Sequence, residues 1–272
     1  MLLPRIITAL ILLPLVLGAI WFGATDHVYA LFSVCALLVA HEWAALSGLQ
    51  QGAARAVYVV LVAVVLAAAW LALAQPQLAL LLFGASALWW LWALRLLLGF
   101  PASVPQAPAQ PVMYGLGLLL IVPAILALAV VHQMANGALK LIYVFGIVWA
   151  ADVGAYAAGR TLGRNKLLPK VSPGKTREGA IGGLLSVLVW ALAWGQLAFA
   201  PQGGEWAWLL ALTLVAALYS IVGDLGISMF KRLTGIKDSG SLLPGHGGLL
   251  DRVDSLLATA PLMAMGLLLL PL

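Results

Sequence analysis

The chain has 272 residues, of which 64% are apolar and only 8% are charged, and its formal net charge is +5. Soluble domains carry about 25% charged residues and disordered chains are polar, so this composition excludes both classes. The apolar runs are long and continuous, which favours membrane helices over a β-barrel. The positive charge fits the bias of membrane loops, and we expect no nucleic-acid partner. A single cysteine, Cys35, excludes an intrachain disulfide and a cysteine metal site.

The apolar pattern predicts an all-α, polytopic integral membrane protein with about nine transmembrane helices. The first segment lacks a convincing signal-peptide cleavage site and another span follows at once, so we interpret it as a retained helix. Residues 101–111 contain four prolines and are predicted to form a linker. Each predicted span has about 20 apolar residues. The spans are 4–24, 27–47, 55–74, 77–99, 112–132, 138–158, 179–199, 205–226 and 250–271.

The basic residues predict the orientation of these spans. If the N-terminus is cytosolic, thirteen of the fourteen Lys and Arg residues lie on the cytosolic side, and Lys140 alone lies outside. Cytosolic loops are enriched in Lys and Arg, so we expect a cytosolic N-terminus and an external C-terminus.

Charge is also distributed unevenly along the chain. Residues 152–254 hold ten of the fourteen basic residues and seven of the nine acidic residues. We therefore expect an N-terminal transmembrane scaffold over residues 1–137 and a C-terminal transmembrane catalytic half over residues 138–272. The cytosolic loops of the catalytic half are predicted at 159–178 and 227–249.

Asp152 lies inside the sixth predicted span, about two turns before its cytosolic end. An ionisable residue at that depth costs a few kcal/mol unless it faces a partner or a polar cavity. An ion pair with Arg160 or Arg164 would satisfy it, and so would a polar site open to the cytosol. The following loop carries six basic residues, which fit lipid headgroup contacts as well as an anion site. These residues are Arg160, Arg164, Lys166, Lys170, Lys175 and Arg177.

The segment Ser172-Pro173-Gly174 predicts a turn ahead of a helix that starts near Thr176. Free N–H groups in the first turn of such a helix are suited to hold a phosphate. The Gly-Lys-Thr run at 174–176 is not a P-loop, because Pro169 stands where that motif requires glycine.

Three carboxylates are predicted to gather at the cytosolic ends of the last two spans. Asp224 is expected to close the eighth span, and Asp251 and Asp254 open the ninth on one helix face. The helix dipole accounts for a carboxylate at a helix start, but not for Asp224 at a helix end. Carboxylate oxygens favour Mg²⁺ or a similar hard cation over zinc. The sequence therefore predicts a metal site formed by these three aspartates.

Cations and glycines flank the three aspartates. The run Pro244–Gly248 fits a flexible loop, but its glycines would also let backbone N–H groups approach an anion around His246. Cations and carboxylates together describe a site for a metal–polyphosphate complex at the membrane surface. The cations are Lys231, Arg232, Lys237 and Arg252.

The run from Ser228 to Asp254 resembles the signature of the phosphatidate cytidylyltransferases, the CDP-diacylglycerol synthases. It contains their Lys-Arg, Lys-Asp, His-Gly-Gly and Asp-Arg-x-Asp elements. Residues 152–160 and 172–179 are also similar to the family, and His41-Glu42-Trp43 more weakly. Members of the family often carry a carboxylate just before the signature serine, where this chain has Ile227.

The resemblance implies that phosphatidate attacks the α-phosphorus of CTP, giving CDP-diacylglycerol and pyrophosphate. This reaction demands positioning, divalent metal and cations rather than a strong base. We expect Mg²⁺, as two divalent ions or one divalent and one monovalent ion, bound by the catalytic residues Asp224, Asp251 and Asp254. The further catalytic residues expected are Lys237 and His246. The expected substrate-binding residues are Asp152, Ser172, Lys175, Thr176, Arg177, Lys231, Arg232, Gly247, Gly248 and Arg252.

Two other functions stay open from the sequence. One is another CTP-dependent lipid phosphotransferase that transfers the γ-phosphoryl group, and the other is a transporter of an anionic substrate. The expected partners are CTP, phosphatidate and the lipid bilayer, and the resemblance is compatible with a homodimer. The resemblance and the short loops indicate a bacterial inner membrane, with the site facing the cytosol.

Overall fold

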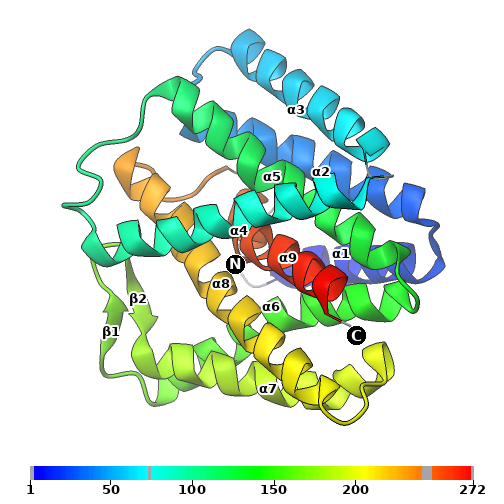
Figure 1. Ribbon diagram of the computed structural model, residues 1–272. Coiled ribbons are helices and arrows are strands. Elements are labelled where there is room, and N and C mark those ends of the chain that lie inside the picture. The colour runs from blue at the N-terminus through cyan, green and yellow to red at the C-terminus, as the bar shows by residue number, and fades with distance from the viewer. Residues whose placement is uncertain (1–2, 73–74, 241–246, 271–272) are drawn as a thin grey trace.

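The computed structural model describes residues 3–72, 75–240 and 247–270, which form a helical bundle with one β-hairpin (Figure 1). In these ranges eight helices are long and apolar enough to cross a membrane, which confirms the all-α polytopic class. The elements are α1 (Leu3–Phe22), α2 (Thr25–Leu46), α3 (Gly52–Ala72), α4 (Pro76–Gly99), α5 (Gln110–Gln133), α6 (Gly137–Thr161), β1 (Lys166–Leu168), β2 (Ser172–Thr176), α7 (Arg177–Phe199), α8 (Glu205–Leu233) and α9 (Leu250–Leu269).

Eight predicted spans coincide with helices to within about three residues, but α8 is longer than predicted. The predicted span ended at residue 226, whereas the helix continues to Leu233. No helix breaker occurs before Gly235, which has a positive φ of 74°, and basic residues in the last turn complement the helix dipole. Asp224 therefore lies inside α8 rather than at its end, and the predicted loop 227–249 begins only after the helix.

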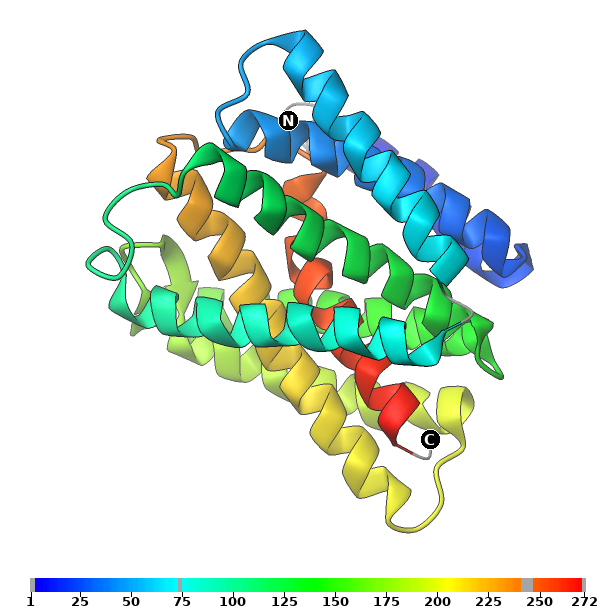
Figure 2. The same ribbon diagram turned by 45° about the horizontal axis from the view of Figure 1, so that its top comes forward.

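Helices α5 and α9 form the centre of the bundle. They have the largest buried share among the membrane-spanning candidates, and α9 packs against α4, α5 and α8. Helices α3 and α7 lie on opposite sides of the bundle in both views and expose most of their apolar side chains (Figure 2). Such apolar outer surfaces are expected where a helix faces lipid.

Successive helices run in opposite directions, so the chain segments between them alternate between the two ends of the bundle. The ends of α2, α4, α6 and α8 lie at the left of Figure 1, together with the β-hairpin. The start of α9 contacts α2 through Glu42 and α8 through Lys231. The described parts of the two charged segments, residues 159–178, 227–240 and 247–249, therefore meet at one end of the bundle.

A hydrogen bond to a proline-containing helix holds α4 against α9. Pro261 lies inside α9 and has no N–H, so it cannot serve the carbonyl of Leu257 one turn earlier. The indole Nε1 of Trp90 in α4 donates to that oxygen at 3.3 Å. Backbone carbonyls in a membrane must find a partner inside the protein, and here another helix supplies it.

Glycines bring α6 and α7 into backbone contact. A Cβ built on Gly154 would lie 2.6 Å from the carbonyl oxygen of Gly182, and one on Gly183 would lie 2.8 Å from that of Ala151. Small residues permit such close approach of membrane helices. A Cβ on Gly179 would lie 3.0 Å from the carbonyl oxygen of Ala155, so these glycines pack α7 closely on α6, and this contact forms one wall of the site.

Candidate active site

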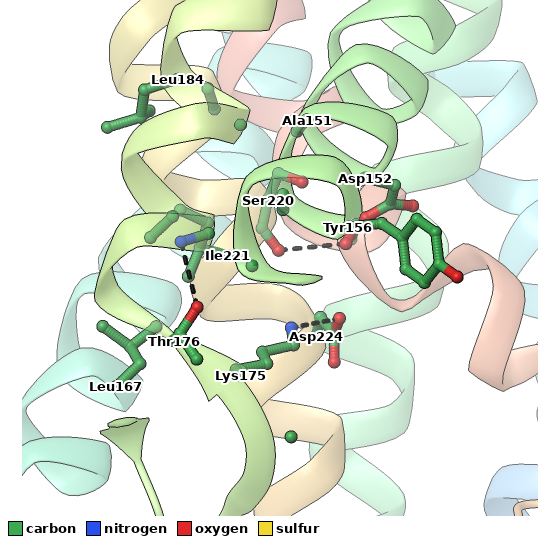
Figure 3. Close-up of a pocket in the computed structure, with 18 of the residues that line it drawn as sticks. Ala151, Asp152, Tyr156, Leu167, Lys175, Thr176, Leu184, Ser220, Ile221 and Asp224 are labelled. Atoms are coloured by element: carbon green, nitrogen blue, oxygen red, sulfur yellow. Dashed lines mark hydrogen bonds and ion pairs between the residues drawn. The ribbon is translucent and has the colours of Figure 1, made fainter. Parts of the chain in front are cut away.

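A pocket of about 390 Å³ lies beside the β-hairpin, between α6, α7 and α8 (Figure 3). Its apolar wall includes Ala151, Leu184, Ala217 and Ile221. Its polar wall lies where the hairpin meets α6 and α8, and includes Asp152, Tyr156, Arg160, Lys175, Thr176 and Asp224. A cavity with these two walls can take a molecule that is polar at one end and apolar at the other.

The hairpin β1–β2 carries Lys175 to the pocket. Lys166 pairs with Thr176 and Leu168 with Ser172 in an antiparallel ladder. The predicted turn at residues 172–174 is wrong, because these residues belong to β2 and the turn comes before them. Pro173 is tolerated in β2 because a two-stranded hairpin consists only of edge strands. The predicted helix start near Thr176 is confirmed.

Two side chains hold the junction between β2 and α7. Thr176 is the N-cap of α7 and its Oγ1 accepts a hydrogen bond from the N–H of Gly179 at 3.1 Å. Glu178 accepts from the N–H of Arg164 at 3.1 Å and from Nδ2 of Asn165 at 2.7 Å. The chain before β1 is thus tied to the first turn of α7, and this fixes the residue that precedes the cap, Lys175.

An ion pair joins Lys175 to Asp224 across the pocket (Figure 3). The hydroxyl of Ser228, one turn further along α8, donates to the other carboxylate oxygen of Asp224 at 3.4 Å. The side chains of Lys175 and Asp224 are 32% and 27% exposed, so both remain accessible to a ligand in the pocket.

Two further aspartates surround this ion pair. Asp152 of α6 interacts electrostatically with Asp224, Lys175 and Arg252. Asp254 of α9 is buried and interacts with Asp224 and Lys175 as well. Carboxylates from three helices therefore share the field of one lysine, and such a group is typical of a functional site.

Arg160 does not act as the ion-pair partner that would have made Asp152 purely structural. Its Nη1 donates to the hydroxyl of Tyr156 at 2.8 Å, and its guanidinium lies 5.9 Å from the centre of that ring. Both side chains line the pocket, so its polar wall has a cation beside an aromatic ring.

A second ion pair lies at the start of α9. Nζ of Lys231 in α8 is 2.6 Å from Oδ1 of Asp251, and the N–H of Ser239 donates to Oδ2 of Asp251 at 2.9 Å. The side chains of Lys231 and Asp251 are only 14% and 10% exposed. Asp251 also lies in the first turn of α9, where the helix dipole favours a negative charge.

The remaining predicted site residues occupy varied positions. Nε of Arg232 donates to the carbonyl of Val171 at 3.1 Å and so holds the hairpin against α8. Lys237 and Arg177 are exposed, Ser172 is half-buried in β2, and none of the three lines the pocket. Gly247 and Gly248 precede α9. His246 lies outside the residues that the structure describes.

The three aspartates of the predicted metal site do not form one compact cluster in the structure. Within residues 3–72, 75–240 and 247–270, no group of three or more His, Cys, Asp or Glu side chains lies close enough to hold a metal ion. Asp224 and Asp251 each have a lysine ammonium as partner instead. Their carboxylate oxygens are nevertheless the donors that a hard cation prefers, and a cation could take the position of either ammonium group.

Glu42, which belongs to the weak family resemblance at residues 41–43 and was not among the predicted site residues, also lies at this end of the bundle. The Glu42 side chain is buried and accepts hydrogen bonds from Leu249 N–H, Leu250 N–H and the Ser239 hydroxyl. Two signals in the sequence pointed to it: the family resemblance of residues 41–43, and its charge, since Glu42 is one of only two acidic residues among the first 151.

Comparison with known proteins identifies the family of the chain. Residues 3–270 match the cytidylyltransferase family. The chain is 45% identical over 267 residues to a phosphatidate cytidylyltransferase of Pseudomonas aeruginosa, covering 97% of this chain and 96% of that protein. It is 36% identical over 280 residues to the enzyme of that name from Haemophilus influenzae, covering 96% of each chain. The chain therefore belongs to the cytidylyltransferase family.

Proposed function

We propose that the protein transfers the cytidylyl group of CTP to phosphatidate and releases CDP-diacylglycerol and pyrophosphate. The observation that carries this proposal is the Lys175–Asp224 ion pair inside a pocket that has one polar and one apolar wall. The pocket suits a lipid with an anionic headgroup, and the relatives at 45% and 36% identity are named for this reaction.

In the reaction, a phosphate oxygen of phosphatidate forms a bond to the α-phosphorus of CTP. The bond from that phosphorus to the bridging oxygen of the β-phosphate breaks, and pyrophosphate leaves with the electron pair. The attacking oxygen is already anionic near neutral pH, so no strong base is required. The protein must bring two anions together and stabilise the charge on the leaving group.

Asp224 and Asp251 are the residues that would hold Mg²⁺, followed by Asp254. The bound ion would supply neutralising charge to the phosphates, as one or two divalent ions or as a divalent and a monovalent ion. Asp152 would add a further negative charge to this group: its carboxylate and that of Asp224 repel each other, and a bound cation would relieve that repulsion.

The cations at this end of the bundle would bind the phosphates. Lys175 and Lys231 already lie within the site as partners of the aspartates. Lys237 and Arg232 are assigned to the triphosphate or pyrophosphate, with His246, Gly247 and Gly248 around it. Lys175 and Thr176 would form the opposite wall, with Ser172 and Arg177 beside them in the chain but outside the pocket lining, and Arg252 would contribute charge beside Asp152.

The proposed reaction and the distribution of basic residues also give an orientation of the protein in the membrane. The charged end of the bundle would face the cytosol, in a bacterial inner membrane, with the N-terminus inside and the C-terminus outside. Residues 138–272 would carry the chemistry and residues 1–137 the scaffold. A homodimer is compatible with this arrangement.

A lipid-product assay tests the reaction directly. Protein purified in detergent is incubated with phosphatidate, Mg²⁺ and CTP labelled with ³²P at the α-position. We expect label in CDP-diacylglycerol, and we expect EDTA or the Asp251→Asn substitution to abolish it. Folded wild-type protein that yields no labelled lipid would refute the proposal.

The position of the label separates the alternatives. A lipid kinase would transfer label from γ-³²P-CTP and none from α-³²P-CTP. A transporter would move an anionic substrate into vesicles without forming a new lipid.

A further inference from the structure

Glu42 is a buried carboxylate that joins the end of α2 to the start of α9 at Leu250, 208 residues further along the chain. It lies near the end of α2, and its side chain is only 2% exposed. Oε2 accepts from Leu250 N–H at 2.7 Å and from Ser239 Oγ at 3.0 Å, and Oε1 accepts from Leu249 N–H at 2.9 Å. Both carboxylate oxygens are therefore engaged by donors from the segment that leads into α9.

Glycines permit the backbone to approach this carboxylate. A Cβ built on Gly240 would lie 2.5 Å from Oε1 of Glu42. A Cβ on Gly248 would lie 2.7 Å from Oε2 of Glu42 and 2.0 Å from Oγ of Ser239. The stretches on both sides of residues 241–246 thus converge on one side chain, and any larger residue at 240 or 248 would force them apart.

The Glu42 contact continues directly into the candidate active site. Ser239, whose hydroxyl donates to Glu42, donates its backbone N–H to Asp251 at 2.9 Å. Leu250, whose N–H donates to Glu42, is the first residue of α9, and Asp251 follows it. Asp251 in turn forms the ion pair with Lys231. Glu42 and Asp251 therefore both accept a hydrogen bond from Ser239, and Glu42 also binds the residue that precedes Asp251.

We propose that Glu42 is a positioning residue for cytidylyl transfer, and that it fixes the start of α9 and with it the carboxylate of Asp251. This inference rests on the proposed function, since it assigns Asp251 to the metal–CTP side of the reaction. Glu42 itself touches no reacting atom in this proposal. It acts through Ser239 and the first residues of α9.

A carboxylate suits this position because it offers only acceptors. Three donors point at the two oxygens of Glu42, and the side chain lies at the positive end of the α9 dipole. Glutamine has nearly the same shape but presents an NH₂ group where one oxygen was. In Glu42→Gln the side-chain NH₂ group therefore faces one of the N–H or O–H donors that bound the carboxylate, and no cavity is left. The substitution is a selective probe of the contact for this reason.

The experiment compares Glu42→Gln, Glu42→Asp and Ser239→Ala with the wild type. We expect Glu42→Gln to raise the KM for CTP, and the Kd for Mg²⁺ with a non-hydrolysable CTP analogue, by about 10- to 100-fold. The KM for phosphatidate should stay within about twofold of the wild-type value. Glu42→Asp retains the carboxylate and should lie closer to the wild type than Glu42→Gln. Ser239→Ala removes one of the three donors and should shift the same constants less.

A matched control and a direct structural readout accompany these constants. Asp26→Asn changes an exposed carboxylate at the other end of α2 and should leave every constant unchanged. Hydrogen exchange should speed up at residues 249–251 in Glu42→Gln and remain unchanged in α6. A merely structural role would lower kcat with the fraction of folded protein and leave both KM values and the analogue Kd as they were.

The outcomes keep this inference separate from the proposed function. If wild-type protein makes no CDP-diacylglycerol, the proposed function fails, and analogue binding with hydrogen exchange still judges Glu42. If the wild type is active but Glu42→Gln binds CTP like the wild type and shows unchanged exchange at residues 249–251, the positioning role is overturned.

Discussion

Lys175 of β2 is ion-paired with Asp224 of α8, 49 residues further along the chain. This pair joins two charged segments that appear independent in the sequence. The lysine belongs to the hairpin between α6 and α7, and the aspartate lies inside a membrane-spanning helix. Their meeting shows that the hairpin folds back over the bundle end and forms part of the pocket there.

Replacing Asp224 by asparagine should abolish turnover without preventing insertion into the membrane. Asparagine keeps the size of the side chain but removes the charge that pairs with Lys175 and that is assigned to the cation. We expect kcat to fall by at least about 100-fold, the scale of losing a major electrostatic contribution to catalysis. Formation of CDP-diacylglycerol and the yield of extracted protein would be measured together. Glu205→Gln, at the far end of the same helix, serves as the control, and an active Asp224→Asn protein would remove Asp224 from the proposed metal ligands.

Lys237→Ala should weaken the use of CTP and leave the fold intact. Lys237 is exposed and lies outside the pocket lining, so its removal disturbs no packing. If its ammonium group binds the triphosphate, the KM for CTP should rise or kcat should fall by about fivefold to thirtyfold. Steady-state kinetics at fixed phosphatidate measures both constants. Lys170→Ala, an exposed lysine in the hairpin turn, should change neither, and equal constants for both variants would refute the phosphate role of Lys237.

Trp90→Phe should destabilise the packing of α4 on α9. The substitution leaves the carbonyl of Leu257 without the indole N–H and without an N–H from Pro261. We expect a loss of about 0.6–2 kcal/mol in the free energy of unfolding, measured as a lower thermal midpoint in detergent.

The neighbouring Trp89 supplies the matched control. Its buried Nε1 has no hydrogen-bond partner among the described residues, so Trp89→Phe should cost less. In a double-mutant cycle, Pro261→Ala should reduce the cost of Trp90→Phe, because alanine restores the N–H that Leu257 lacks. If the effects of Trp90→Phe and Pro261→Ala are additive, the indole N–H does not compensate for the N–H that is missing at Pro261.

Gly154→Ala should separate α6 from α7. The added Cβ would lie 2.1 Å from Oγ of Ser186 and 2.6 Å from the carbonyl oxygen of Gly182, and the backbone atom cannot move aside cheaply. Overpacking of this kind costs about 1–3 kcal/mol, visible as a lower thermal midpoint. Gly84→Ala in α4 meets no atom within 4 Å and should be neutral or slightly stabilising. If both alanine variants unfold at the same temperature as the wild type, the close backbone contact is not required.

The helices were predictable because the membrane requires long apolar segments, and their length alone marks them. The end of α8 could not be predicted in this way, because hydropathy indicates where a helix leaves the apolar layer of the membrane and not where the helix ends. Residues 227–233 continue as helix because nothing before Gly235 breaks it. The hairpin was missed for a related reason: Ser172, Pro173 and Gly174 are turn formers by composition, and only pairing with β1 makes them a strand.

Within the site, charge and spacing identified Asp152, Lys175, Asp224, Asp251 and Asp254, all of which the structure brings to one end of the bundle. The pairing of each lysine with its aspartate could not be deduced, because it depends on how α8 packs against the hairpin and α9. Glu42 was noted only through the weak family resemblance of residues 41–43, because its partners are mainly backbone N–H groups, which have no signature in a sequence.

The contact between Glu42 and Leu250 spans 208 residues, and this sets a delay during synthesis. At about 5–20 residues per second, roughly 10–40 s separate the appearance of the carboxylate from that of its last donor. The end of the bundle that carries the candidate active site can therefore close only after α9 has been made, so the Glu42 contact forms in the last step of assembly.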